Sequence, residues 1–340
     1  MGFARAAGVP VVLIGDIDRG GVIASLVGSH RVLSDADRRM VAGFMINRFR
    51  GEVSLFTPGL ADISRHTGWP SFGVLPFIPE AARLPAEDAV SLERPAGSTG
   101  ATIRIAVPML SRIANFDDFD PLKAEPDVSL EMIPPGKPLP LDADLIILPG
   151  TKATLPDLAF LRQQGWHHDL ITHVRHGGRL LGICGGYQML GREITDAHGI
   201  EGPAGTVKGL GLLAIETTLG PSKRLCEVTA KSAIDDLPLD GFEMHMGLTE
   251  GADCARPFLH ITRDAGTVPG GAVNADGRIA GCYLHGLFRA DGFRHAFLST
   301  LKARRESDLV YDDSIGQALD AFAEAMAHNL DIEAMLASAA

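Results

Sequence analysis

The sequence predicts a two-domain α/β protein, and three observations lead to this fold class. The chain has 340 residues, enough for two domains of about 150 residues each. Its hydrophobic content is 46% and its charged content 21%, which is typical of globular proteins with large cores. Nearly continuous apolar runs alternate with segments of helical or loop character, as in parallel sheets covered by helices on both faces.

The first domain is expected at residues 1–78, where three apolar runs indicate parallel strands. The runs are VPVVLIGDI at 9–17, VAGFMINRF at 41–49 and FGVLPF at 72–77. Three strands make an incomplete sheet, so we expect upstream sequence to be missing and this part to be the end of a larger domain. The charged, proline-containing stretch at 79–100 predicts a linker.

The second domain is expected at residues 101–300, where the alternation starts again. Its predicted elements are TIRIAVPML (102–110), DADLIILPG (142–150), the helix LPDLAFLRQQ (155–164), GRLLGIC (178–184), LGLLAIETTL (210–219), FLHITRD (258–264) and RIAGCYLHGLF (278–288). Apolar residues at helical spacing predict a helical tail at 301–340.

Composition and charge exclude several classes of protein. A net charge of -11 argues against a nucleic-acid partner, which would require a basic stripe. The four cysteines form no CxxC pair, which argues against zinc and disulfides, predicts no bound metal and fits a cytoplasmic protein. No run of ~18 apolar residues is present, and the start lacks a signal-peptide pattern, so we expect no membrane partner.

The stretch LLGICGGYQMLG at 180–191 places a cysteine between an apolar strand and a helix. Glycines around Cys184 favour a sharp strand-to-helix turn of the kind that carries a nucleophile. A buried structural cysteine is the alternative. His285, at the end of another apolar run, is the best candidate for its base and for the acid that protonates leaving ammonia. A histidine at a strand end is otherwise more often structural.

An acyl-transfer site also needs donors for an oxyanion. The backbone NH of Gly185 is one candidate, and the turn LPGTK offers others at Gly150 and Thr151. An ordinary strand-ending turn explains LPGTK equally well.

These motifs carry a specific resemblance over essentially the whole chain. GICGGYQMLG with YLHGLF resembles the class I glutamine amidotransferases, in the branch that handles corrinoid carboxylates. GDIDRGGVIASLVG, INRFRGE, TGWPSFGVLPF, GTKATLPDLAFLRQQGW and GFEMHMG are similar to the cobyric acid synthase family. The resemblance implies an incomplete, dethiobiotin-synthetase-like P-loop domain followed by a flavodoxin-like amidotransferase domain.

The resemblance also implies an activity. The family amidates the b, d, e and g carboxylates of adenosylcobyrinic acid a,c-diamide in cobalamin biosynthesis, with glutamine as nitrogen source and ATP with Mg²⁺ for activation. Glutamine and a corrinoid are therefore the expected small-molecule partners. Cys184 would form the glutamyl thioester, His285 would act as acid and base, and Gln188 would help to hold glutamine.

Two departures from the family pattern matter. Leu287 stands where class I sites usually carry the glutamate that orients the histidine, so a Cys-His dyad is implied. Glu243 in GFEMHMG is a nearby carboxylate without an assigned role. No G-x-x-x-x-G-K-[ST] phosphate loop is present in the sequence, so we expect this chain alone to be competent only for glutamine hydrolysis.

The first domain nevertheless keeps candidate ligands. Asp16 and Asp18 end an apolar strand and suit magnesium or substrate binding, Arg19 suits a carboxylate or phosphate, and Asn47 matches the position at which related P-loop synthetases read adenine. Turn formation explains the same residue types. A fragment, a subunit with a separate P-loop chain, a decayed enzyme and the sibling a,c-diamide synthase remain as alternatives.

Overall fold

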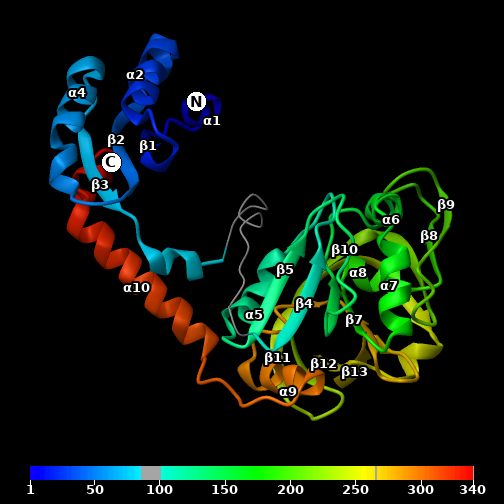
Figure 1. Ribbon diagram of the computed structural model, residues 1–340. Helices are drawn as coiled ribbons and strands as arrows, with labels where there is room; N and C mark the ends of the chain where they lie inside the picture. The colour runs from blue at the N-terminus through cyan, green and yellow to red at the C-terminus, as the bar shows by residue number, and fades with distance from the viewer. Residues whose placement is uncertain (86–100, 265, 340) are drawn as a thin grey trace. The chain divides into compact units, whose positions relative to one another are not determined.

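The computed structural model describes residues 1–85, 101–264 and 266–339, and the chain divides into two compact units (Figure 1). One unit comprises Met1–Leu84 with Asp313–Ala340, and the other comprises Pro85–Asp312. The linker expected at 79–100 begins as a short 3-10 helix, η3 (Pro79–Arg83), and its residues 86–100 lie outside the described ranges.

The first unit is built on a parallel sheet in the order β1-β2-β3, which confirms the three expected strands. The strands are β1 (Val11–Asp16), β2 (Val41–Phe49) and β3 (Ser71–Pro76). The helices between and before them are α1 (Gly2–Ala7), η1 (Ile17–Arg19), α2 (Val22–Val32), α3 (Asp35–Arg38), η2 (Val53–Phe56) and α4 (Thr57–Thr67). Apolar side chains of α2 and α4 pack with those of β2 and β3 in one core.

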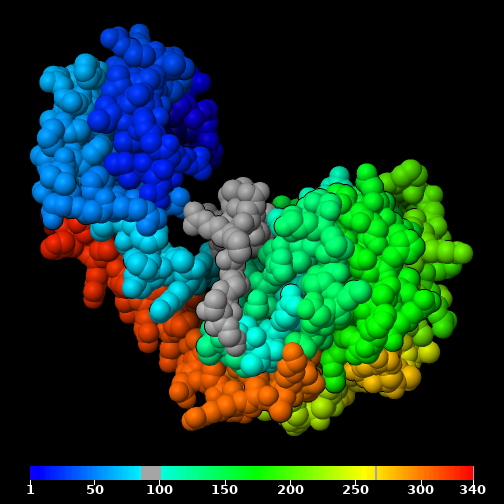
Figure 2. All heavy atoms as spheres, viewed as in Figure 1, coloured from blue at the N-terminus to red at the C-terminus, as the bar shows by residue number. Residues whose placement is uncertain are grey.

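The C-terminal segment differs from the separate tail expected at 301–340. Its helices are α10 (Tyr311–Asn329) and α11 (Ile332–Ala337), and from Asp313 onward they belong to the first unit. Phe322, Met326 and Leu330 pack against Met45 and other buried residues of β2 and β3, and the red C-terminal atoms lie against the blue and cyan ones in Figure 2. The amphipathic helices therefore supply the second layer that this small sheet needs to bury its other face.

The second unit contains a six-stranded sheet in the order β14-β15-β7-β6-β4-β5. The strands are β4 (Ile103–Pro108), β5 (Val128–Ile133), β6 (Leu145–Leu148), β7 (Arg179–Ile183), β14 (Ala272–Val273) and β15 (Ile279–Cys282). All neighbours are parallel except β14, which runs antiparallel to β15. The predicted α/β class is thus confirmed for the second unit.

The second unit also contains a sheet of seven strands. Its strands are β8 (Glu193–Asp196), β9 (Gly205–Lys208), β10 (Ile215–Ser232), β11 (Pro238–Gly251), β12 (Leu259–Arg263), β13 (Gly266–Gly270) and β16 (Leu284–His285). The helices of this unit are η5 (Phe116–Phe119), α5 (Asp120–Ala124), α6 (Thr154–Gln163), α7 (Trp166–Arg175), α8 (Gly185–Leu190), η6 (Ala252–Ala255) and α9 (Asp291–Leu301).

Two apolar cores cover the two faces of the six-stranded sheet. Along β6, Ile146 and Leu148 pack with buried residues of α6, α7 and α8, whereas Leu145 and Ile147 pack with β10, β12 and α9. This alternation is the two-residue period of a strand buried on both sides. Packing on both faces holds these strands in place, and the candidate site lies at the ends of β7 and β15.

Candidate active site

Cys184 occupies the sharp turn that the sequence predicted. It follows β7 directly, precedes α8, and has φ 53° and ψ -110°, a strained conformation for a residue with a side chain. Its NH donates to the carbonyl of Cys282 at 2.9 Å. The side chain is 8% exposed and the thiol donates to the carbonyl of Met244 at 3.1 Å. The strain is consistent with a turn retained for function.

His285 lies beside this cysteine, in β16. The residue is fully buried, pairs with Phe242 of β11, and stacks on that ring with centroids 5.1 Å apart. A hydrogen bond and charge interaction with Cys184 help to raise the pKa of the imidazole. The predicted cysteine and histidine are therefore brought together by the ends of two segments: Cys184 follows β7, and His285 lies just beyond β15, the strand that pairs with β7.

A third partner, Asp118 in η5, was not predicted from the sequence. The His285 Nδ1 donates to Asp118 Oδ2 at 2.7 Å, and the NH of Gly286 donates to Asp118 Oδ1 at 2.7 Å. Burial alone would lower the pKa of His285, but the charge and hydrogen bond of Asp118, assisted by Cys184, raise it to about 10. Asp118 therefore favours the imidazolium form of His285 over the neutral imidazole expected of a free base.

Asn115 is a second missed neighbour of the histidine. Its Nδ2 lies 3.2 Å from Nε2 and 3.3 Å from Nδ1 of His285. Asn115 adopts a left-handed backbone with φ 50°, which asparagine tolerates better than most residues. Its carbonyl accepts the NH of Asp118 at 3.1 Å, so this turn sets the position of Asp118.

The predicted oxyanion turn lies at the same place. A Cβ added at Gly150 would lie 3.1 Å from His285 Cε1 and 3.8 Å from Cys184 Cβ, so the backbone at Gly150 closely approaches both side chains. A Cβ at Gly185 would lie 3.4 Å from the backbone nitrogen of Thr151. The structure thus brings together five of the six predicted catalytic and oxyanion positions around one point.

Gln188, the sixth position, is close in sequence but already bonded within the protein. Its Oε1 accepts from Thr154 at 2.7 Å, and its Nε2 donates to the Met246 carbonyl at 3.0 Å and to Tyr283 Oη at 3.1 Å. It is 3% exposed. A direct contact to glutamine stays a prediction.

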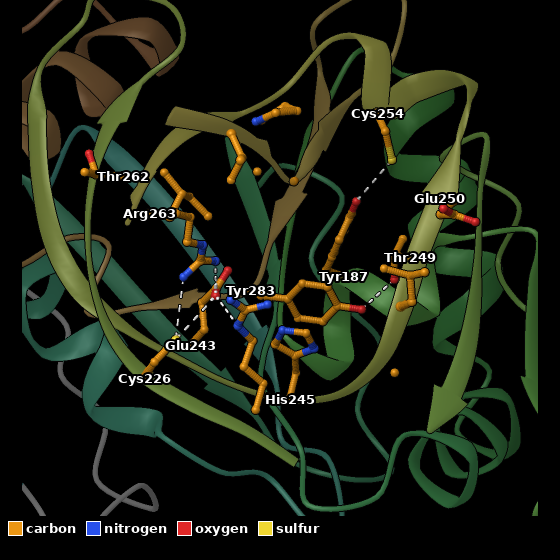
Figure 3. Close-up of a pocket in the computed structure, with 18 of the residues that line it drawn as sticks. Tyr187, Cys226, Glu243, His245, Thr249, Glu250, Cys254, Thr262, Arg263 and Tyr283 are labelled. Carbon is orange, nitrogen blue, oxygen red and sulfur yellow. Dashed lines mark hydrogen bonds and ion pairs between the residues drawn. The ribbon is translucent and has the colours of Figure 1, made fainter. Parts of the chain in front are cut away.

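Glu243 lines a cavity of about 1040 Å³ (Figure 3), and it follows Phe242, the residue paired with His285, so its side chain lies on the opposite face of β11. Its carboxylate pairs with Arg263 and, at 3.2 Å, with Arg224. Leu287 is fully buried in an apolar cluster with Phe288 and Phe293. Neither residue supplies the carboxylate that orients His285.

The predicted ligands of the first unit lie at the ends of β1 and β2. Asp16 is paired in register with Asn47 and forms ion pairs with Arg48 at 3.3 Å and with Arg19 at 3.5 Å. Asp18 pairs with Arg50 at 3.0 Å, and Asn47 accepts the NH of Arg48 at 2.8 Å. The sheet therefore gathers all four predicted positions into a cluster of alternating charges.

Within residues 1–85, 101–264 and 266–339, no group of three or more His, Cys, Asp or Glu side chains is placed to hold a metal ion. The helices of the same ranges all fall short of the length and apolar character needed to cross a bilayer.

Comparison with known proteins assigns the second unit first. A family described as the CobB/CobQ-like glutamine amidotransferase domain matches residues 104–293. The unit is thus a glutamine amidotransferase domain of the CobB/CobQ-like class. The match encloses Cys184, His285 and Asp118.

Curated relatives then extend the assignment to the whole chain. Cobyric acid synthase from Hyphomonas neptunium is 54% identical over 340 residues, which is 100% of this chain and 68% of the relative. Those from Brucella canis and Paracoccus denitrificans are 56% and 57% identical over 339 residues, 100% of this chain and 69% of each relative. The chain belongs to the cobyric acid synthase family, which confirms the resemblance.

The comparison with solved structures includes PurLQS from Thermotoga maritima. It matches with a TM-score of 0.43 and 16% identity over 65% of this chain and 99% of that chain. A score this low carries no argument about the site.

Proposed function

We propose that this chain carries the glutamine-hydrolysing part of cobyric acid synthase and supplies ammonia for corrinoid amidation. The observation that carries the proposal is the strained Cys184 turn beside a buried His285 that is hydrogen-bonded to Asp118. The ammonia would be used on the b, d, e and g carboxylates of adenosylcobyrinic acid a,c-diamide, as the family membership implies.

The chemistry begins when His285, whose pKa is raised by Asp118, takes the proton of the Cys184 thiol. An imidazolium holds a neighbouring thiolate by charge, and the thiolate is the nucleophilic form of cysteine. Cys184 Sγ attacks the γ-carboxamide carbon of glutamine. The resulting oxyanion is placed within reach of the backbone NH groups of Gly185 and of the Gly150–Thr151 turn, which are suitable donors for it.

His285 then serves in both directions. As an acid it protonates the leaving nitrogen, so that ammonia departs and a glutamyl thioester remains on Cys184. As a base it removes a proton from the water that attacks the thioester. Glutamate leaves, and the thiolate and imidazolium are restored.

For the first unit we propose an incomplete P-loop, dethiobiotin-synthetase-like domain. Arg19 and the nearby Asn47 suit a carboxylate or phosphate ligand and a nucleotide base. The residues present do not by themselves fit Mg²⁺-ATP, because Asp16 and Asp18 are both engaged by arginines and the sequence contains no G-x-x-x-x-G-K-[ST] loop.

Glutamate release from glutamine, measured on the 340-residue chain and its Cys184→Ala variant, tests the proposal. We expect slow hydrolysis by the wild type and none by the variant, with both proteins folded. Equal hydrolysis by the two would refute the role of Cys184. A wild-type chain that is folded and does not hydrolyse glutamine would contradict the proposal as well.

A further inference from the structure

We propose that Asp118 is the positioning residue of the site: it orients His285 and keeps its proton on Nδ1, in the place that glutamate usually holds. The inference rests on the proposed glutamine hydrolysis. It replaces the Cys-His dyad that the sequence predicted with a three-residue arrangement whose acid comes from a distant loop.

The geometry of the carboxylate carries the proposal. One oxygen accepts from His285 Nδ1 and the other from the NH of Gly286, each at 2.7 Å. Both side chains are buried, at 0% and 3% exposure. Two hydrogen bonds from consecutive residues fix the plane of the carboxylate, which in turn fixes the rotation of the imidazole; Nε2 is not bonded to Asp118 and lies 3.2 Å from Asn115 Nδ2.

The loop that carries Asp118 is itself tied to the site. Ala114 NH donates to the Gly150 carbonyl at 2.9 Å, and Ile113 forms an antiparallel bridge with Thr151. The segment that holds the carboxylate is therefore anchored to the oxyanion turn. Asp118, His285 and Gly150 form one connected unit rather than three independent loops.

Electrostatics supports the same role. Burial without a charged partner would lower the pKa of an imidazole. The charge and hydrogen bond of Asp118 are the two leading causes that instead raise the pKa of His285 to about 10. Glu243 cannot take over, because Arg224 and Arg263 hold it on the cavity side of β11.

The decisive variant is Asp118→Asn, which has nearly the same shape. The NH of Gly286 continues to need an acceptor, so the amide oxygen faces Gly286 and the amide nitrogen faces Nδ1. Nδ1 must then be an acceptor, the proton moves to Nε2, and the imidazolium is disfavoured. The equivalent change in a serine protease triad lowers kcat by about 10⁴. We expect kcat for glutamine hydrolysis to fall ~10²–10⁴-fold with little change in KM.

A second readout does not require turnover. The rate of alkylation of Cys184 by iodoacetamide, followed by mass spectrometry of its peptide, should show a pH profile displaced to higher pH in Asp118→Asn. Asp117→Asn removes the neighbouring exposed carboxylate, which interacts with His285 through charge alone, and is the matched control, with a much smaller displacement expected than in Asp118→Asn. Circular dichroism and thermal melting check that each variant is folded.

A double variant separates positioning from a structural role. If Asp118 acts through His285, adding Asp118→Asn to His285→Ala should lower the remaining activity by less than twofold. A wild-type kcat and alkylation profile in a folded Asp118→Asn variant would overturn the proposal. It would also be overturned if the fold-loss of activity in the double variant equalled the product of the losses in the two single variants. Should Asp118→Asn not fold, Asp118→Ala is assayed with and without added formate, which replaces the missing carboxylate. If formate restores no glutamine hydrolysis, the proposal is contradicted. A fully active Cys184→Ala variant would instead refute the hydrolysis mechanism itself.

Discussion

Placing a carboxylate at residue 287, where class I amidotransferases usually carry the orienting glutamate, should damage this protein rather than improve it. Leu287 is fully buried among Phe288, Phe293 and other apolar side chains. Leu287→Glu loses about 2 kcal/mol of apolar transfer free energy. Keeping the new carboxyl neutral at pH 7 costs a further ~4 kcal/mol, because its pKa must rise from about 4.3 to above 7. The expected loss of unfolding free energy is therefore roughly 6 kcal/mol, enough to unfold many domains.

Urea unfolding of Leu287→Glu and Leu287→Gln at pH 5 and pH 8 measures this cost. The folded-state pKa of the new carboxyl is raised above its unfolded value. The free energy of unfolding of Leu287→Glu, relative to that of Leu287→Gln, is thus greatest below about pH 4.3 and falls as pH rises toward the folded-state pKa. The glutamine variant, of similar size, should show no such dependence. Two results together would show that residue 287 can reach the histidine and that the packing argument is wrong. The two variants would be equally stable at pH 8, and Leu287→Glu would keep its glutaminase activity when Asp118→Asn is added to it.

Further outcomes are expected at the other positions. His285→Ala should lose ~10²-fold or more of glutamine hydrolysis; near wild-type activity would exclude it as acid and base. Gly150→Ala should lower kcat without unfolding the chain, because the new methyl lies 3.1 Å from His285 Cε1; an unchanged kcat would contradict a tight approach there. Calorimetry should detect no tight binding of Mg-ATP by the 340-residue chain, and micromolar affinity would show that the nucleotide site is elsewhere than expected.

The parts of the fold set by local periodicity could be predicted from the sequence. Apolar runs gave the three strands of the first sheet and most of the six-stranded sheet, because strands buried on both faces have little choice of residue. The partner of the C-terminal helices could not be predicted in this way. An apolar stripe shows that Phe322 and Met326 must be buried, but it does not say against which sheet, and the contact with β2 and β3 joins positions far apart in the chain.

The site was predictable to the same degree. Cys184 and His285 were found because glycines and strand ends mark where the backbone turns, and Gly150 because a strand must end there. Gln188 was placed correctly on α8, but its hydrogen bonds to Thr154 and Met246 depend on strands that periodicity does not bring together. Local sequence gives a side chain's place on its element and leaves its partners to the tertiary fold.

Asp118 shows why the third residue escaped a search by motif. The expected acid was sought at a fixed spacing from His285, yet what the imidazole requires is a carboxylate at its Nδ1, whichever loop provides it. Catalytic triads are recognised by geometry and by the role of each group, and the order of the residues along the chain varies between folds. Here position 287 points into the apolar core, and a left-handed turn at Asn115 aims a carboxylate at the same nitrogen from 167 residues away. The missing glutamate in the sequence therefore indicates a changed source for the acid rather than its loss.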